Sequence, residues 1–81
     1  MVFQVLNKLK WKGGLDVCII TIRHRGAPDD EKKIHGSEVT KVKKSYFCYT
    51  NNKGEETVIP LHRILRMEKE GKVLWKKSQK G

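Results

Sequence analysis

The sequence predicts an α+β domain in which an N-terminal helix packs on a curved antiparallel sheet of five or six short strands. Apolar residues recur at helical spacing near the N-terminus, at Val2, Val5, Leu6 and Leu9. The later apolar stretches are short, and Gly, Asn and Pro separate them instead of further helical segments. Because parallel strands need long crossover connections, these short links favour antiparallel pairing. Closure of the sheet into a partly closed small barrel is an open alternative.

The predicted helix is expected to end at Gly13 and Gly14, because paired glycines favour the backbone conformation that terminates helices. Lys8 and Lys10 take its polar side. Trp11 stands just before the glycines, and we interpret it as a core side chain at the point where the helix meets the sheet.

The most apolar stretch, VCIITIR at residues 17–23, is apolar on both strand faces until Arg23. This pattern predicts a central strand that is covered on two sides. Residues 26–33, GAPDDEKK, combine Gly, Pro and charged residues, and we expect them to form a loop.

The middle of the chain predicts a second group of strands. Residues 38–44 and 46–50 have the composition of two antiparallel strands, and NNKG at residues 51–54 predicts a turn after them. ETVIPL at residues 56–61 predicts another strand, which ends or bends at Pro60 because proline cannot donate to a sheet ladder.

The C-terminal part predicts a hairpin over residues 63–77 with its turn at Glu70 and Gly71. Residues 78–81, SQKG, predict a disordered basic tail. We therefore expect a single domain over residues 1–77.

The charge of the chain favours a polyanionic partner. The chain has 18 Lys and Arg residues against 9 Asp and Glu, a net charge of +9 over 81 residues. We favour nucleic acid over a surface that only maintains solubility, because the excess is basic rather than balanced. No apolar run approaches the length of a membrane span, so no membrane partner is expected. The N-terminus lacks the apolar core and cleavage site of a signal peptide, so we expect a cytoplasmic location.

The cysteines and histidines do not predict a metal or cofactor site. Cys18 and Cys48 lie far apart inside strand-like runs, and we expect two buried thiols rather than a disulfide. The chain has no CxxC motif and only three histidines, so zinc has little support.

Two His-Arg pairs follow apolar stretches and predict a phosphate site. His24 and Arg25 precede Gly26, and His62 and Arg63 stand in the run IPLHRIL. A guanidinium matches two oxygens of a phosphate, histidine adds a donor, and glycine lets backbone N–H groups come close. The prediction requires that the two segments converge in space. The alternative is that both pairs are ordinary polar residues at strand ends.

Aromatic and basic residues elsewhere fit the same hypothesis. Trp75 or a tyrosine would stack on a base or pack against a ribose, although core packing is the more common role of single aromatic residues. We expect Lys41, Lys43 and Lys44 to attract the RNA backbone without reading its sequence.

Five segments of the chain, taken in order, resemble one known family. They are LNKLKW, HRGAP, IHGSE, IPLHRI and VLWKK. They are similar to the small archaeal proteins of the RNA cyclic-group-end recognition domain family, whose relatives are fused to eukaryotic phosphoesterase-like and zinc-finger proteins. The resemblance extends from about Val5 to Lys77. The eukaryotic-type domains continue after the tryptophan with an acidic residue and Arg, whereas Lys76 and Lys77 stand here.

The resemblance implies a module that recognises RNA ends with a cyclic phosphate, in RNA processing or repair. By motif it nominates Arg25, Pro60, His62, Arg63 and Trp75. We therefore expect a non-catalytic protein that binds a phosphate-bearing RNA end, with a separate RNA-processing enzyme as a partner. One alternative is a basic module that docks on a protein or on the ribosome. A second is a metal-independent phosphoesterase that uses His24 and His62 as acid and base.

Overall fold

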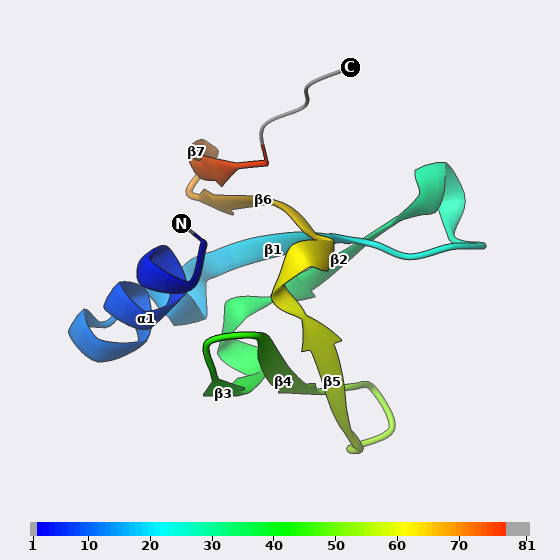
Figure 1. Ribbon diagram of the computed structural model, residues 1–81, viewed down its shortest axis with the longest axis horizontal. Coiled ribbons are helices and arrows are strands. Elements are labelled where there is room, and N and C mark those ends of the chain that lie inside the picture. Colours follow the sequence, from blue (N-terminus) through cyan, green and yellow to red (C-terminus); the bar gives the residue numbers. More distant parts are fainter. Residues whose placement is uncertain (1, 78–81) are drawn as a thin grey trace.

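The computed structural model describes residues 2–77, and the tail predicted at residues 78–81 lies outside the described residues. Helix α1 (Val2–Lys12) comes first (Figure 1). Within the described residues it is followed by seven strands: β1 (Cys18–Arg23), β2 (Glu31–His35), β3 (Val39–Val42), β4 (Tyr46–Thr50), β5 (Glu56–Pro60), β6 (Ile64–Lys69) and β7 (Lys72–Lys76). Four short 3₁₀ turns connect them: η1 (Leu15–Val17), η2 (Pro28–Asp30), η3 (Gly36–Glu38) and η4 (Leu61–Arg63).

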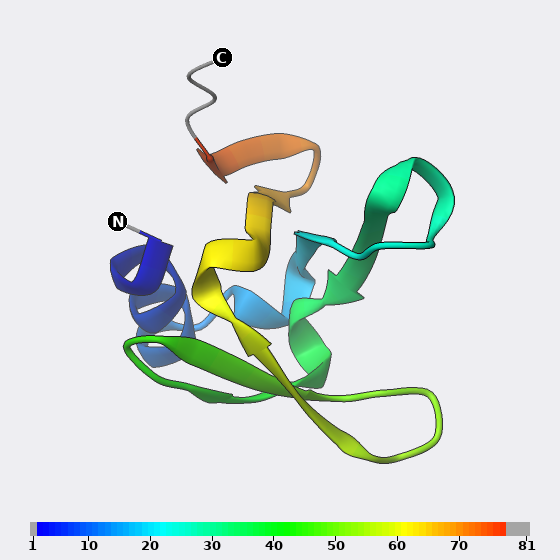
Figure 2. The ribbon, with the colours of Figure 1, turned by 45° about the vertical axis from the view of Figure 1, so that its right-hand side comes forward.

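The strands form two antiparallel sheets. One sheet has the order β2-β1-β6-β7, and the other has the order β3-β4-β5. Turn η3 takes the chain from the first sheet to the second, and η4 brings it back, as Figure 2 shows between β5 and β6. The α+β class predicted from sequence is confirmed. The single sheet of five or six strands is replaced by two sheets that do not close into a barrel.

Gly36 and Pro60 explain why the strand ladders break where the chain passes from one sheet to the other. A Cβ atom at Gly36 would lie 1.7 Å from the carbonyl oxygen of Leu15, so only glycine lets η3 pack directly on η1. Pro60 ends β5 because it has no N–H group to continue a ladder, as predicted. At each of these positions a 3₁₀ turn redirects the chain, so the strands before and after it belong to different sheets.

Helix α1 covers one side of the core, and its limits agree with the prediction. It ends before Gly13 and Gly14, which both adopt positive φ. Leu6 is fully buried, whereas 82% of Trp11 is exposed, so the interpretation of Trp11 as a core residue is wrong. Trp11 follows Leu6 by five residues, and in an α-helix this spacing turns its side chain about 140° away from the buried stripe.

Strand β1 is the central strand that the sequence predicts, since it pairs with β2 on one side and β6 on the other. Ile20 and Ile22 face the core, and Thr21 on the opposite face is also buried. The loop predicted over residues 26–33 extends too far, because β2 begins at Glu31. Ile34 is the only buried residue of β2, so the sequence of this strand shows no alternation of apolar and polar residues.

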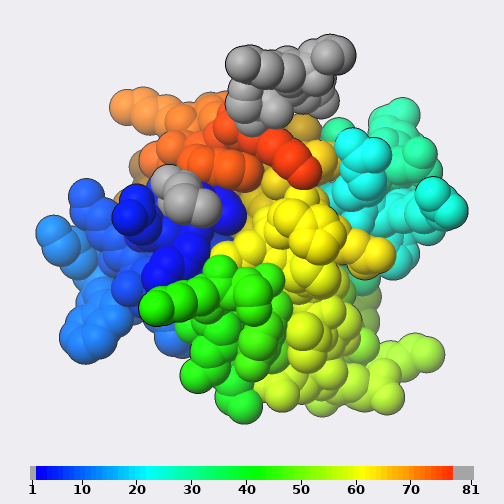
Figure 3. All heavy atoms as spheres, viewed as in Figure 1, coloured from blue at the N-terminus to red at the C-terminus, as the bar shows by residue number. Residues whose placement is uncertain are grey.

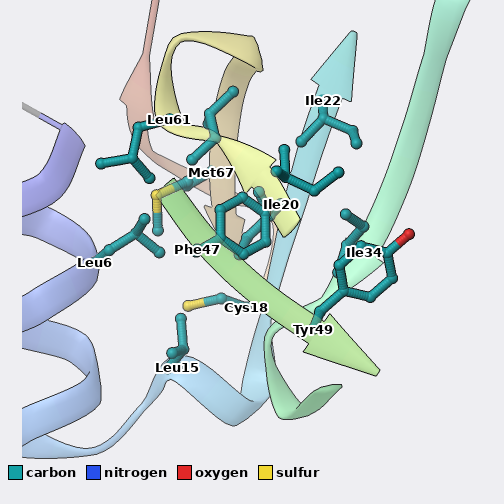
Figure 4. Packing of buried hydrophobic residues seen from close by; sticks show 12 residues of the cluster. Leu6, Leu15, Cys18, Ile20, Ile22, Ile34, Phe47, Tyr49, Leu61 and Met67 are labelled. Carbon is teal, nitrogen blue, oxygen red and sulfur yellow. The ribbon is translucent and has the colours of Figure 1, made fainter. Parts of the chain in front are cut away.

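The core lies between the two sheets and is made of side chains from nearly every element (Figure 4). Phe47 of β4 stands at its centre against residues of β1, and Leu6 of α1 closes one side. Cys18 and Cys48 are buried free thiols, as predicted. Burial raises the pKa of the Cys18 thiol, an effect that the nearby Lys69 ammonium opposes. Within residues 2–77, no helix combines the length and apolar character needed to cross a bilayer.

Candidate nucleic-acid interface

A hollow of about 310 Å³ opens where four distant segments of the chain meet. Figure 3 shows these segments on one face: the start of α1, the turn between β3 and β4, η4, and the end of β7. The floor of the hollow is mostly apolar, and three basic side chains contribute to its lining. The lining residues are Val2, Phe3, Lys44, Leu61, His62, Ile64, Trp75 and Lys77.

Backbone hydrogen bonds hold Lys44 and His62 at the same hollow. The tight turn between β3 and β4 is closed by the N–H of Lys43, which donates to the carbonyl oxygen of Tyr46 at 2.8 Å. The N–H of Leu61 in η4 donates to the carbonyl oxygen of Ser45 in that turn at 3.0 Å. Turn η4 is thereby tied to the lysine-bearing turn, although the two are separated by the whole of β4 and β5.

Trp75 faces the hollow because of the register between β6 and β7. It lies opposite Met67, which is fully buried, so both side chains point toward the core side of the sheet. Trp75 is half-buried at the margin of the core cluster, where it packs against the buried residues and also lines the hollow. Its indole therefore has a supported position and one accessible surface.

Lys77 lines the hollow although the sequence does not predict it as a site residue. Its backbone N–H donates to the carbonyl oxygen of Leu65 at 2.8 Å, and its Nζ donates to the carbonyl oxygen of His62 at 2.8 Å. An ammonium group has three donors, and among the contacts within residues 2–77 two of those of Lys77 stay available beside His62. The motif VLWKK contains Lys77, but the carbonyl oxygen of His62 that accepts from its Nζ lies 15 residues away in the sequence.

The acidic residues are segregated from the segments around the hollow. All nine Asp and Glu residues lie within positions 16–38 and 55–70. Helix α1, residues 39–54 and residues 71–77 therefore contain lysines and no carboxylate side chains. Glu56 nevertheless lies against β3, since the hydroxyl of Thr40 donates to its Oε2 at 2.9 Å. The lining of the hollow itself contains Lys44, His62 and Lys77 and no acidic residue, so the hollow favours anions.

The hollow brings together three of the residues that the sequence nominates, namely His62, Trp75 and Lys44. Lys43 is exposed in the same turn as Lys44, and Lys41 is exposed on β3. The basic turn predicted to attract RNA thus borders the hollow directly.

The two His-Arg segments leave neighbouring strands at the same end, because Ile22 of β1 lies opposite Ile64 of β6. His62 lines the hollow, whereas His24, Arg25, Gly26 and Arg63 do not. These four residues are exposed.

The loop after β1 closes on itself. The N–H of His24 donates to the carbonyl oxygen of Asp30 at 2.8 Å, and the N–H of Gly26 donates to Asp30 Oδ1 at 3.4 Å. The φ angle of Gly26 is 93°, a region that favours glycine, so the turn itself accounts for this residue. The Gly26 donor predicted for a phosphate is engaged with a carboxylate.

Arg66 is a cation that is already paired. Its Nη2 lies 3.2 Å from Glu31 Oε1 and its Nε lies 3.4 Å from Glu68 Oε1, across the outer face of the four-stranded sheet. The hydrogen bond that Arg66 donates to Glu31 raises the pKa of Arg66, and Glu68 adds to this effect. Within residues 2–77 both ion pairs of the structure involve Arg66, so the lysines around the hollow have no carboxylate partner there.

In the part of the chain that the structure describes, no group of three or more His, Cys, Asp or Glu side chains is placed to hold a metal ion.

Comparison with known proteins identifies relatives over nearly the whole chain. The model of the MJ1316 RNA cyclic group end recognition domain matches residues 1–77. The UPF0248 protein MJ1316 of Methanocaldococcus jannaschii is 37% identical over 82 residues, which cover 96% of this chain and 95% of the relative. A UPF0248 protein of Thermococcus sibiricus is 38% identical over 81 residues, covering 96% and 86% of the two chains. The UPF0248 protein SSO2687 of Saccharolobus solfataricus is 30% identical over 79 residues, covering 93% and 94%. No solved structure gives a significant match.

Proposed function

Since this chain belongs to the family of the MJ1316 RNA cyclic group end recognition domain, we propose that it binds a phosphate-bearing RNA end in the hollow without catalysing a reaction. The observation that carries the proposal is the combination of an apolar floor with Lys44, His62 and Lys77 from three separate segments. A role in RNA processing or repair follows from the same proposal, with a separate enzyme acting on the bound RNA.

The size of the hollow suits a single terminal nucleotide. Its volume of about 310 Å³ is at the lower end of the range of roughly 300–1,000 Å³ for small-molecule sites. A ribose with its phosphate and part of a base fills such a space. A folded RNA element does not enter it.

The basic residues supply the contacts to the phosphate. Within residues 2–77, Lys77 keeps two further N–H donors beside His62, and Lys44 lines the hollow from another segment. Charged donors bind phosphate oxygens more strongly than neutral ones. We assign the terminal phosphate to these three side chains, because His24, Arg25, Gly26 and Arg63 lie outside the hollow. Those four residues stay predicted contacts to RNA, and the assignment does not depend on them.

The apolar floor favours a cyclic phosphate over an open monophosphate. A 2′,3′-cyclic phosphate carries one negative charge and no free hydroxyl on the ring, whereas a terminal monophosphate carries close to two charges at neutral pH. Removing the second charge from water costs free energy that the few donors of the hollow do not replace. Trp75 and Phe3 add apolar contact to the ribose or base.

The two-histidine mechanism has weaker support than binding. It requires an acid and a base on either side of one phosphorus atom. His62 lines the hollow and His24 does not, so the second group is missing from the site that we propose. Incubation of cyclic-phosphate RNA with the protein, followed by mass spectrometry of the RNA, checks this point, and we expect the RNA to be unchanged.

The direct test is filter binding with short RNAs of one sequence that end in a 2′,3′-cyclic phosphate, a 3′-phosphate or a 3′-hydroxyl group. We expect the cyclic end to bind most tightly. A charge-assisted hydrogen bond contributes about 1.5–3 kcal/mol, so Lys77→Ala and Lys44→Ala should each weaken binding of the cyclic end about ten- to hundredfold.

The matched control is Lys53→Ala, which removes the same charge from the exposed turn between β4 and β5. Because Lys53→Ala removes only one diffuse charge, the affinity for the cyclic-phosphate RNA should change less than threefold. Equal affinity for the three ends, with equal losses in all three variants, would mean a diffuse basic surface. If none of the RNAs binds, the alternative of a module that docks on a protein or on the ribosome is favoured.

A further inference from the structure

We infer that the RNA strand leaves the hollow along the seam between α1 and β7, and that Trp11 stacks on a base about three nucleotides from the end. The inference rests on the proposed function, because it extends the same site from one nucleotide to a single strand. It assigns a role to the most exposed large apolar side chain of the described residues.

Trp11 is placed where a base can reach it. It is 82% exposed on the side of α1 that points away from the core. Asn7 and Lys8 lie one helical turn before it, at spacings that place them on the same surface. An aromatic face beside lysines is the arrangement that single-stranded nucleic acids use for stacking, because every base has a π face and every nucleotide has a phosphate.

A second hollow lies along α1 and includes Lys8, which is one helical turn before Trp11, although Trp11 itself does not line it. Its volume is about 370 Å³, and its lining comes from α1, the adjoining Gly13 and β7. The first hollow uses Val2 and Phe3 of α1 with Trp75 of β7, and the second uses the later part of α1 with Leu74. The two hollows therefore follow one another along one seam. The second is lined by Val5, Lys8, Leu9, Lys12, Gly13 and Leu74.

The charge of the seam selects RNA over a protein partner. Helix α1 contributes Lys8 and Lys12 to the second hollow, and neither α1 nor β7 has an acidic residue. Lysine is depleted at protein–protein interfaces, where an apolar patch is normally surrounded by mixed polar residues. Lysines that alternate with exposed apolar side chains, without compensating carboxylates, match a chain of phosphates and bases.

The length of the helix sets the number of nucleotides. Phe3 and Trp11 are eight positions apart, which corresponds to about 12 Å at ~1.5 Å per helical residue. Stacked nucleotides advance about 3.4 Å each, so the base on Trp11 lies three to four steps from the end and belongs to about the fourth or fifth nucleotide. A dinucleotide that occupies the first hollow does not reach it.

The test compares a dinucleotide and a hexanucleotide that both end in a 2′,3′-cyclic phosphate, with affinity measured by fluorescence anisotropy of a 5′ label. Trp11→Ala should weaken binding of the hexanucleotide about five- to tenfold, at the lower end of the effect of losing one stacked base. The dinucleotide should bind with unchanged affinity. Trp11→Phe should restore most of the hexanucleotide affinity, because the ring face is kept.

Val58→Ala is the matched control, because Val58 is 57% exposed on β5 of the other sheet. It should change neither affinity. Circular dichroism and the midpoint of thermal unfolding should show that Trp11→Ala folds normally, since the side chain makes little buried contact.

Separate outcomes overturn the two proposals. If the cyclic end is preferred but Trp11→Ala leaves the hexanucleotide affinity unchanged, the path along α1 is wrong and the end site stands. If the end group has no effect on the binding of either RNA, the proposed function itself fails. If sedimentation shows a dimer that Trp11→Ala dissociates, with no loss of RNA affinity, the seam is a contact between two copies of the chain and the inference is overturned.

Discussion

The substitution Gly36→Ala should strongly destabilise the protein, because the added methyl group has no space. Its Cβ would lie 1.7 Å from the carbonyl oxygen and 2.8 Å from the carbonyl carbon of Leu15, and 3.3 Å from the carbonyl oxygen of Cys18. All three are backbone atoms, so no side chain can rotate away. Turns η1 and η3 must separate instead, and Leu15 belongs to the core.

The magnitude follows from the cost of overpacking. Extra methyl groups in packed sites cost about 1–3 kcal/mol when side chains can adjust, and more when they cannot. We therefore expect a loss of about 3 kcal/mol or more, which corresponds to a fall of roughly 12–24 °C in the thermal midpoint of a domain of this size. Circular dichroism during heating, together with urea titration, measures both quantities.

Gly54→Ala separates the clash from the conformational preference of glycine. Gly54 has a φ of 79° and no atom within 4 Å of the added Cβ, whereas Gly36 does not adopt a positive φ. Placing alanine in the left-handed region costs about 1 kcal/mol, so Gly54→Ala should lower the midpoint by only a few degrees. If Gly36→Ala melts as high as Gly54→Ala, the close contact between η1 and η3 is not present in solution.

The remaining predictions concern ionisable groups. Burial raises the pKa of the Cys18 thiol, so the folded state resists the thiolate form. The contribution of the buried, protonated thiol to the stability of the fold is complete below the unfolded pKa of about 8.5. This contribution is lost as the pH rises through the raised pKa of the folded state. Between pH 8 and pH 10, urea titrations should therefore show a smaller fall in the free energy of unfolding for Cys18→Ala than for the wild type. Equal falls in the two proteins would contradict this. Replacing Arg66 with Met breaks both of its ion pairs; a small fall in the thermal midpoint with unchanged RNA affinity is expected, and a large loss of affinity would place RNA on that face of the sheet. Lys43→Ala should lower the salt dependence of RNA binding by about one phosphate contact, measured as the slope of the logarithm of affinity against that of salt concentration; an unchanged slope would remove Lys43 from the RNA path.

Much of the fold was predictable because its signals are local. The helical stripe at the N-terminus, the apolar run that forms β1, and the Glu70-Gly71 turn each depend on residues that are close in sequence. Strand β2 was missed because one buried residue, Ile34, does not make a pattern. The helical period places Trp11 away from the buried stripe, so its exposure follows from its position, whereas its residue type favours burial.

The candidate site was only partly predictable. The motif IPLHRI and the segment VLWKK contain His62, Trp75 and Lys77, and the structure brings all three to one hollow. The phosphate site predicted from the two His-Arg pairs requires that both segments converge, but of their residues only His62 lines the hollow. Its position depends on the hydrogen bond between Leu61 and Ser45, which no local pattern reveals.

The sequence by itself determined the α+β class, the order of most elements, the basic character and the family, because composition, apolar period and motif order are properties of the chain. Only the tertiary structure decided that the strands divide into two sheets and that Lys44, His62 and Lys77 share one opening. The physical reason is that these outcomes depend on contacts between residues far apart in sequence. Gly36 against Leu15, and Lys77 against His62, are examples.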